Sequence, residues 1–102
     1  MIQKEDLKAI RERALADCSP ETAFYVCDGT VLRNLQQLAD IIPTMGDEVF
    51  KYHVNADKND FANWINDILG DSKLAQKLKK IKTQQKYSET VAQRLKEFMA
   101  KA

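Results

Sequence analysis

Glycine, proline, cysteine and histidine are all scarce in this sequence, and the shortages exclude several kinds of site. Three glycines among 102 residues cannot build a glycine-rich loop of the type that cradles phosphate. The two cysteines, Cys18 and Cys27, have neither a metal-knuckle nor a redox spacing, and we expect both to stay reduced. Together with the single histidine, His53, they would supply only three ligands of a zinc site, so we expect no metal and no other cofactor.

Long hydrophobic runs are also missing. No apolar stretch approaches the roughly 20 residues that cross a bilayer. The N-terminal segment alternates charges with single aliphatic residues instead of forming a signal-peptide core. We therefore expect no membrane partner and a cytoplasmic location. A hydrophobic fraction of 44% and a charged fraction of 30% are typical of a folded protein, and we expect one domain over residues 1–102.

Hydrophobic periodicity predicts a mainly α-helical domain of about five helices with one short β-hairpin. The first helix is expected from about Gln3 to Asp17, and Ser19–Pro20 would end it. Caps and breakers then predict three further helices. These are a helix capped by Asn34 and ended by Pro43, a helix from Gly46 to about Asn55, and a helix from Asn59 or Asp60 to Gly70.

The predicted strands flank Asp28–Gly29. Phe24–Cys27 and Thr30–Arg33 are β-prone tetrads, and the Asp-Gly pair accepts the positive φ angles of a type I′ turn. The pattern therefore predicts a tight hairpin that pairs Val26 with Val31. A helix that runs straight on through the second tetrad is the alternative, because short apolar runs do not distinguish the two structures.

Turn, cap and aromatic residues follow one another in a fixed order between Phe24 and Leu78. The order is aromatic-x-x-x-Asp-Gly, Asn-Leu-x-x-Leu, Phe-x-x-His-Val, Asn-Asp-Phe-Ala-x-Trp-Ile and Gly-Asp-x-x-Leu-Ala. With these motifs residues 24–78 resemble a family of small uncharacterised domains from archaea and bacteria, and they form the family-like core of the chain. The resemblance implies a fold and carries no established activity.

From Asp71 onward the pattern is helical, and residues 79–102 are expected to form a basic amphipathic C-terminal helix. Polar residues at 83–85 interrupt the apolar stripe, and Ser88 with Glu89 would cap a new helix. The sequence leaves two alternatives open for residues 71–102. One long helix would overhang the core and favour a salt-sensitive homodimer, whereas two helices would complete the core of a monomer.

Charge is divided unevenly along the chain. Residues 1–72 hold seven Lys or Arg against thirteen Asp or Glu, and residues 73–102 hold nine against two, so a net charge of −6 is followed by one of +7. Residues 73–86 contain no acid, which predicts a basic helix that meets an acidic partner, although such runs are often only solvated. Nucleic acid is the alternative ligand, and its binding would be weak, because the run lacks arginine and interleaved aromatics. The six lysines are Lys73, Lys77, Lys79, Lys80, Lys82 and Lys86.

His53 and Trp64 are the other candidate site residues. His53 shares a predicted helix face with Val49 and Phe50, where a lone histidine is more often packed and hydrogen-bonded than catalytic. Trp64 is expected in the core, and together with His53 it is a candidate border of a partner groove. A catalytic His53 would need Asp57, Asp60 or Asp67 beside it.

These observations predict a non-enzymatic interaction or regulatory module without catalytic residues, whose partner is another protein or a second copy. Nucleophilic catalysis has no support along the chain, because Cys18 and Cys27 each stand next to an aspartate and next to no positive residue. Weak sequence-independent binding of nucleic acid is the second hypothesis. A small hydrolase-type enzyme that uses His53 is the third and least supported.

Overall fold

A computed structural model describes residues 6–100 of the chain. Within this range the chain forms six α-helices, two short segments of 3₁₀ and π geometry, and one two-stranded antiparallel sheet. The predicted mainly α-helical class with one β-hairpin is confirmed. The elements in chain order are α1 (Leu7–Leu15), β1 (Phe24–Tyr25), β2 (Val31–Leu32), α2 (Leu35–Ile41), η1 (Ile42–Thr44), α3 (Asp47–His53), α4 (Asp60–Trp64), η2 (Ile65–Leu69), α5 (Ser72–Leu78) and α6 (Gln84–Ala100).

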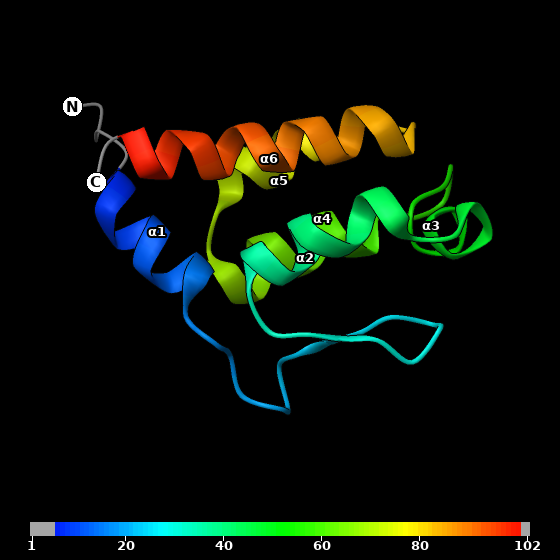
Figure 1. The fold of residues 1–102 in the computed structure, drawn as a ribbon, viewed down its shortest axis with the longest axis horizontal. Coiled ribbons are helices and arrows are strands. Elements are labelled where there is room, and N and C mark those ends of the chain that lie inside the picture. Colours follow the sequence, from blue (N-terminus) through cyan, green and yellow to red (C-terminus); the bar gives the residue numbers. More distant parts are fainter. Residues whose placement is uncertain (1–5, 101–102) are drawn as a thin grey trace.

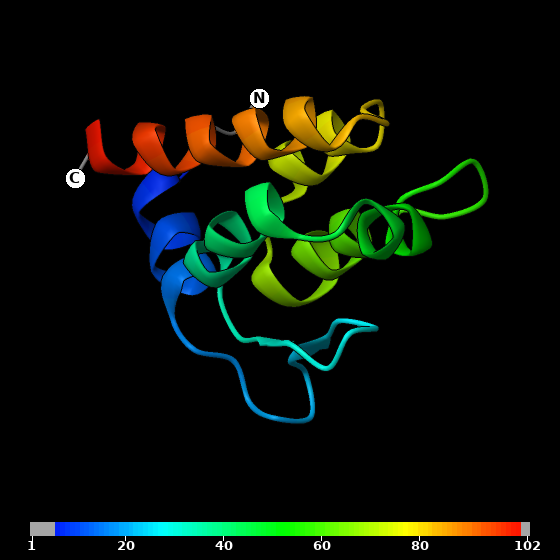
Figure 2. The same ribbon diagram turned by 45° about the vertical axis from the view of Figure 1, so that its right-hand side comes forward.

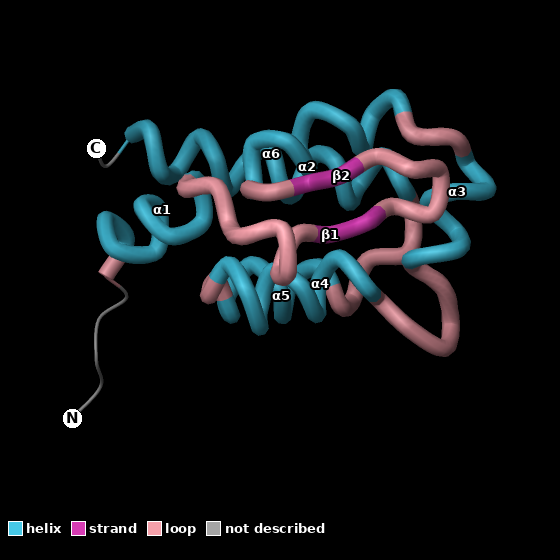
Figure 3. The backbone as a smooth tube through the Cα atoms, turned by 90° about the horizontal axis from the view of Figure 1, so that it is seen from below, coloured by secondary structure: helices cyan, strands magenta, loops and turns pink. Residues whose placement is uncertain are grey.

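Helix α6 lies along one side of the molecule and the β-hairpin along the opposite side, with α2 and α4 between them (Figure 1). The turned view keeps this order and shows α5 next to α6 (Figure 2). Seen from the hairpin side, β1 and β2 form a short ribbon in front of the helices (Figure 3). Helix α1 contacts η2, α2 and α6, so it closes one end of the helical layer.

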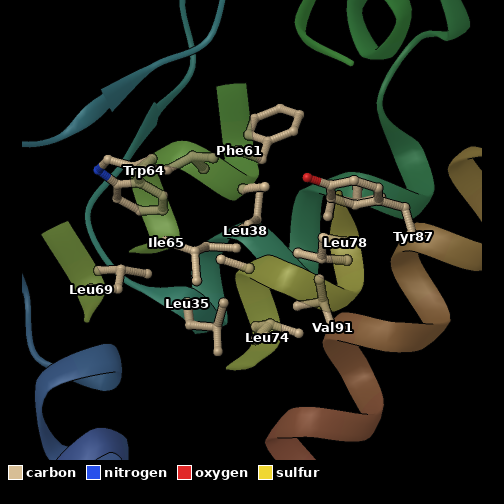
Figure 4. Packing of buried hydrophobic residues seen from close by; sticks show 14 of the residues in the cluster. Leu35, Leu38, Phe61, Trp64, Ile65, Leu69, Leu74, Leu78, Tyr87 and Val91 are labelled. Atoms are coloured by element: carbon tan, nitrogen blue, oxygen red, sulfur yellow. The ribbon is translucent and has the colours of Figure 1, made fainter. Parts of the chain in front are cut away.

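The hydrophobic core forms between these helices. Figure 4 shows side chains from α2, α4, η2, α5 and α6 converging on one interior. Aliphatic and aromatic residues at helical spacing supply it, as the periodicity predicts, and burial of their apolar surface is the main source of stability in such a domain. The labelled members are Leu35, Leu38, Phe61, Trp64, Ile65, Leu69, Leu74, Leu78, Tyr87 and Val91, all of them buried.

Local signals set several helix boundaries where the sequence predicts them. The Asn34 side chain caps α2 by accepting a hydrogen bond from the backbone N–H of Gln37 at 2.8 Å. Asn59 caps α4 in the same way through the N–H of Ala62 at 3.2 Å. Gly70 ends η2 with a φ of +77°, a left-handed conformation that glycine adopts without steric cost.

Helix α2 ends at Ile41, just before Pro43, as the sequence predicts, and Pro43 itself lies in the first turn of the 3₁₀ segment η1, where no intrahelical N–H donor is required. Helix α1 ends at Leu15, ahead of Ser19–Pro20, because the chain becomes extended and the N–H of Cys18 bonds to the carbonyl of Arg33 at 2.9 Å. The predicted start of α1 at Gln3 lies outside the described residues.

The β-hairpin forms, but its register differs by one residue from the predicted pairing of Val26 with Val31. Residues directly opposite each other in a hairpin point to the same face. Val26 is buried, whereas Val31 is exposed, so they cannot be opposite partners in this packing. The observed pairs are Phe24 with Leu32 and Tyr25 with Val31.

The loop of the hairpin explains the shift. The N–H of Val26 donates to the carbonyl of Thr30 at 2.8 Å, and the N–H of Gly29 donates to the carbonyl of Val26 at 2.9 Å, so three residues lie in the loop instead of two. A type I′ turn needs positive φ at both central residues. Gly29 has a φ of +99° but Asp28 does not have a positive φ, and the longer loop removes that requirement.

In the C-terminal third the chain forms two helices, which is one of the two alternatives that the sequence left open. Helix α5 ends at Leu78, and α6 starts at Gln84, ahead of the predicted cap at Ser88. Because the chain reverses between them, α6 packs its apolar stripe onto the same molecule, where Phe98 is buried and Leu95 is only 9% exposed. The long helix whose overhang would favour a homodimer is therefore not formed within residues 71–100.

Candidate functional site

The six lysines of the predicted site are all exposed, but they do not lie on one helix. We call residues 73–86 the basic segment. The prediction of a continuous basic helix over this range is wrong, because α5 stops at Leu78 and the chain turns before α6 begins at Gln84. Lys73 and Lys77 belong to α5, Lys79, Lys80 and Lys82 to the connection, and Lys86 to α6.

The reversal brings two lysines of the basic segment to one groove. Lys77 and Lys86 both line a groove of about 370 Å³ between α5 and α6. Lys82 donates a hydrogen bond from Nζ to the carbonyl of Asn55 at 3.3 Å, which ties the connection to the loop after α3. Lys77, Lys79, Lys80 and Lys86 form no ion pair with any described residue. These four side chains therefore present their positive charge to solvent.

The groove between α5 and α6 is itself of mixed charge. Glu89 and Glu97 line it together with Arg94, and Nη1 of Arg94 lies 3.6 Å from Oε2 of Glu97. An anion inside the groove would meet these carboxylates, so the interior does not select one sign of charge. The exposed lysines on its rim and in the connection are the part of the surface that favours an acidic ligand.

A buried ion pair that the sequence interpretation missed lies beneath this groove. Arg94 donates to the two carboxylate oxygens of Asp71, from Nε at 2.8 Å and from Nη2 at 2.9 Å, with both side chains almost wholly buried. Asp71 also caps α5 by accepting from the N–H of Leu74 at 3.2 Å. The position of Arg94 could have predicted this pair from the sequence. Arg94 shares a helix face with Val91 and Phe98, and an arginine on a buried face requires a buried acid.

His53 lies at the end of α3 and is only 4% exposed. Its ring packs against three aromatic rings, with centroid distances of 5.0 Å to Phe24, 5.2 Å to Phe61 and 4.9 Å to Tyr52. These residues come from β1, α4 and α3, so His53 sits where the hairpin meets the helices. The side chain is in the interior, as its helical spacing with Phe50 predicts.

Both ring nitrogens of His53 have partners. Nδ1 lies 3.0 Å from Oδ2 of Asp60, and the backbone N–H of Cys27 donates to Nε2 at 3.0 Å. Because Nε2 accepts a hydrogen bond, it carries no proton, and the proton of the neutral ring is on Nδ1 and donates to Asp60. Asp60, one of the three aspartates named from the sequence, is thus the partner of His53. The nitrogen that would serve as a general base is already engaged by an amide.

Lys58 and Asp60 complete the polar part of this region. Nζ of Lys58 lies 3.0 Å from Oδ2 of Asp60 and 4.1 Å from the ring centroid of Tyr52. The hydrogen bond to Asp60 raises the pKa of Lys58 above its ordinary value. Lys58 is also within electrostatic range of the Cys27 thiol.

Trp64 lies on α4 and is 7% exposed. Its indole Nε1–H donates to the carbonyl of Thr22 at 2.8 Å, and its ring makes an edge contact with Phe24 at a centroid distance of 5.7 Å. Trp64 therefore fixes the segment before β1 onto α4. His53 and Trp64 are linked through Phe24, and the structure places both of them in the interior and not on an open surface groove.

No three His, Cys, Asp or Glu side chains between residues 6 and 100 converge in a way that could hold a metal ion. None of the helices in this range combines the length and the hydrophobicity needed to cross a membrane.

Comparison with known proteins identifies a family. Residues 18–99 match the model of a family of unknown function, DUF5752. The match includes the whole segment 24–78 on which the resemblance to uncharacterised domains rests, and it extends through the basic segment and α6. No curated protein and no solved structure matches the chain.

Proposed function

We propose that this chain, which belongs to the DUF5752 family of unknown function, is a non-enzymatic interaction module that binds an acidic protein surface through the basic segment. The observation that carries the proposal is the exposure of all six lysines over fourteen residues that contain no acid. The turn between α5 and α6 carries Lys79, Lys80 and Lys82, and Lys77 and Lys86 lie on the adjoining ends of the two helices. Clustered charge of one sign accelerates encounter with a partner of opposite sign and helps to select it.

Two features favour a protein partner over nucleic acid. Single-stranded nucleic acid is usually held by aromatic side chains that stack on bases, as well as by charge. Tyr87, the aromatic residue that follows the basic segment, is fully buried in the core and is not available for stacking. All six cations are lysines, which act as point charges and do not provide the planar bidentate contacts of arginine.

The non-enzymatic part of the proposal is supported by the hydrogen bonds of His53. A general base needs a free nitrogen within reach of substrate, and both nitrogens of His53 are engaged inside the protein. A cytoplasmic location completes the proposal, because a chain with two free cysteines, of which Cys27 is exposed, suits a reducing compartment.

The test compares two charge-matched variants against two defined probes. The first variant carries Lys77→Gln, Lys79→Gln and Lys80→Gln, and the control carries Lys8→Gln, Lys51→Gln and Lys96→Gln, which are exposed lysines outside the basic segment. The probes are fluorescent polyglutamate and a fluorescent DNA of arbitrary sequence, as single strand and as duplex. Anisotropy titrations at low ionic strength and over a salt series give the affinities.

We expect polyglutamate to bind the parent and the control, and the first variant to lose that binding by about tenfold or more, since three charge contacts are removed. Binding of DNA more tightly than polyglutamate, with a steep decrease as salt rises, would replace the proposal with nucleic-acid binding. Absence of binding to both probes at low salt, or equal loss in the control variant, would refute a role for the basic segment.

A further inference from the structure

Among the described residues, the loop at the tip of the β-hairpin, residues 27–29, forms one hydrogen bond to a residue outside the hairpin. Cys27, Asp28 and Gly29 are exposed. The hydrogen bonds at Gly29 and Thr30 stay within the hairpin. The bond from the N–H of Cys27 to Nε2 of His53 is the connection from this loop to a helix, and it spans 26 positions of the chain.

This bond exists only while Nε2 of His53 carries no proton. Protonation would place an N–H on Nε2, directed at the N–H of Cys27, so two donors would face each other and the amide would lose its acceptor. Histidine is the side chain whose charge ordinarily changes between about pH 5 and 8. We propose that His53 is a pH-responsive latch that holds the tip loop on α3 when neutral and releases it when protonated.

Two carboxylates near His53 favour its protonated form, in which the tip loop is released. Asp60 lies 3.0 Å from Nδ1 and keeps its hydrogen bond in both states, and it favours the charged ring. Asp28, on the tip loop, is also within electrostatic range of His53, and the backbone N–H of Thr30 lowers the pKa of its carboxyl, so it remains charged in mild acid.

Two effects oppose the charged ring. Lys58 lies 3.0 Å from the same oxygen of Asp60, and its positive charge repels a protonated His53 ring. Burial among neighbouring aromatic rings also disfavours a charge on His53. The phenol of Tyr52 and the thiol of Cys27 are the other titratable groups near the ring. Protonation of His53 strengthens its contact with Asp60, because the two groups then carry opposite charges. It breaks the contact with Cys27, because two N–H donors then face each other.

The motion is confined to the tip loop. Val26 and Leu32 are buried and anchor the hairpin on the core, and neither depends on His53 for its backbone hydrogen bonds. The released state thus frees residues 27–29 and leaves the hairpin, including the bond between Val26 and Thr30, in place. The tip loop, which carries the free thiol of Cys27 at its first residue, thus loosens in acid.

Amide hydrogen exchange by NMR tests the latch on the intact chain. Spectra between about pH 7.5 and pH 5 follow the ring signals of His53, which are unambiguous because the chain has one histidine. We expect protection of the Cys27 amide, corrected for the intrinsic pH dependence of exchange, to fall about fivefold with the same midpoint as the ring, as the loss of one hydrogen bond predicts. The Val26 amide, which bonds to Thr30, is the internal control and should not change.

The variant His53→Gln provides the matched comparison, because an amide oxygen can accept from the Cys27 N–H and does not titrate in this range. Its Cys27 amide should keep the same protection at both pH values. The latch is refuted if the parent's Cys27 amide stays protected after the ring has been protonated, or if the ring remains neutral down to about pH 5. Equal loss of protection at Cys27 and Val26 would also refute it, because it would mean that the whole hairpin unfolds.

Discussion

The hydroxyl of Tyr87 donates a 2.6 Å hydrogen bond to Oδ1 of Asn59, and this contact joins the start of α6 to the start of α4. Nδ2 of the same Asn59 donates to the carbonyl of Leu78 at the end of α5, at 3.0 Å, and Oδ1 also accepts from the N–H of Ala62. One buried amide thus holds three helices in register. Burial raises the pKa of Tyr87 well above its ordinary value.

The substitution Tyr87→Phe should destabilise the protein by about 1–2 kcal/mol, since it removes the hydroxyl's hydrogen bond and leaves part of a buried polar group unsatisfied. The aromatic ring keeps its contact with Phe50, so the fold should persist. Urea unfolding measures the difference. Tyr25→Phe is the control, because Tyr25 is exposed and its hydroxyl bond to the carbonyl of Pro20 should contribute little. Equal losses in the two variants would contradict the assigned role of Tyr87.

The raised pKa of Tyr87 also predicts an alkaline loss of stability. Below about pH 10 the phenol is protonated in the folded and unfolded chains alike, and its contribution is complete. Above that pH the unfolded chain releases the proton and the folded chain does not, so the free energy of unfolding falls as pH rises. We expect the advantage of the parent over Tyr87→Phe to shrink by up to about 1.4 kcal/mol per pH unit above pH 10. A constant difference between pH 8 and pH 11 would show that Tyr87 ionises equally in both states.

Breaking the buried pair of Arg94 and Asp71 should be costly. Arg94→Met leaves a buried carboxylate without its main partner, which typically costs about 3–5 kcal/mol. Adding Asp71→Asn should recover a large part, because asparagine still caps α5 through the N–H of Leu74 and carries no charge. Lys51→Met, which breaks the exposed pair with Asp47, is the control and should cost less than about 1 kcal/mol. Chemical denaturation is measured for the parent, Arg94→Met, Asp71→Asn, the double variant and the Lys51→Met control, and additive losses in the double variant would contradict coupling of the pair.

Gly70→Ala should destabilise the turn between η2 and α5 by about 1–2 kcal/mol from its positive φ alone. A Cβ at this position would also lie 2.7 Å from Nη1 of Arg13 and disturb the bond that Nε of Arg13 donates to the carbonyl of Ile68. Gly29→Ala separates the two effects, because Gly29 has a positive φ and open space around it. Thermal unfolding should show the larger loss at Gly70. If both variants lose the same stability, the contact with Arg13 does not matter.

The chain should be a monomer at low and at high salt, because α6 buries its apolar stripe on its own core. Leu95→Ala should then lower the stability of the monomer by about 2–4 kcal/mol. Met99→Ala is the control, since Met99 is 65% exposed and its loss should change stability by less than about 0.5 kcal/mol. Sedimentation velocity and unfolding measurements check both. A dimer at low salt that Met99→Ala dissociates would restore the homodimer as the preferred partner.

Features of the fold that depend on neighbouring residues alone were predictable from the sequence. Asn34 and Asn59 are caps because their side chains bond to amides three positions later, and Gly70 ends a helix because it tolerates a left-handed conformation. The amphipathic periodicity gave the helical class and the buried positions of His53 and Trp64. The exposure of the six lysines followed from their charge.

Only the tertiary structure decided the features that depend on contacts between distant segments. The hairpin register followed from which face of each strand the core covers. The polar residues at 83–85 left the choice between one helix and two open, and the packing of α6 against α5 decided it. Asp71 and Arg94 are 23 positions apart, and Cys27 and His53 are 26 apart, so their hydrogen bonds exist only in the folded chain. The amino-acid sequence thus determined the helices, their caps and the distribution of charge, whereas the fold decided which polar groups meet in the interior, because burial leaves each of them in need of a partner that sequence proximity does not supply.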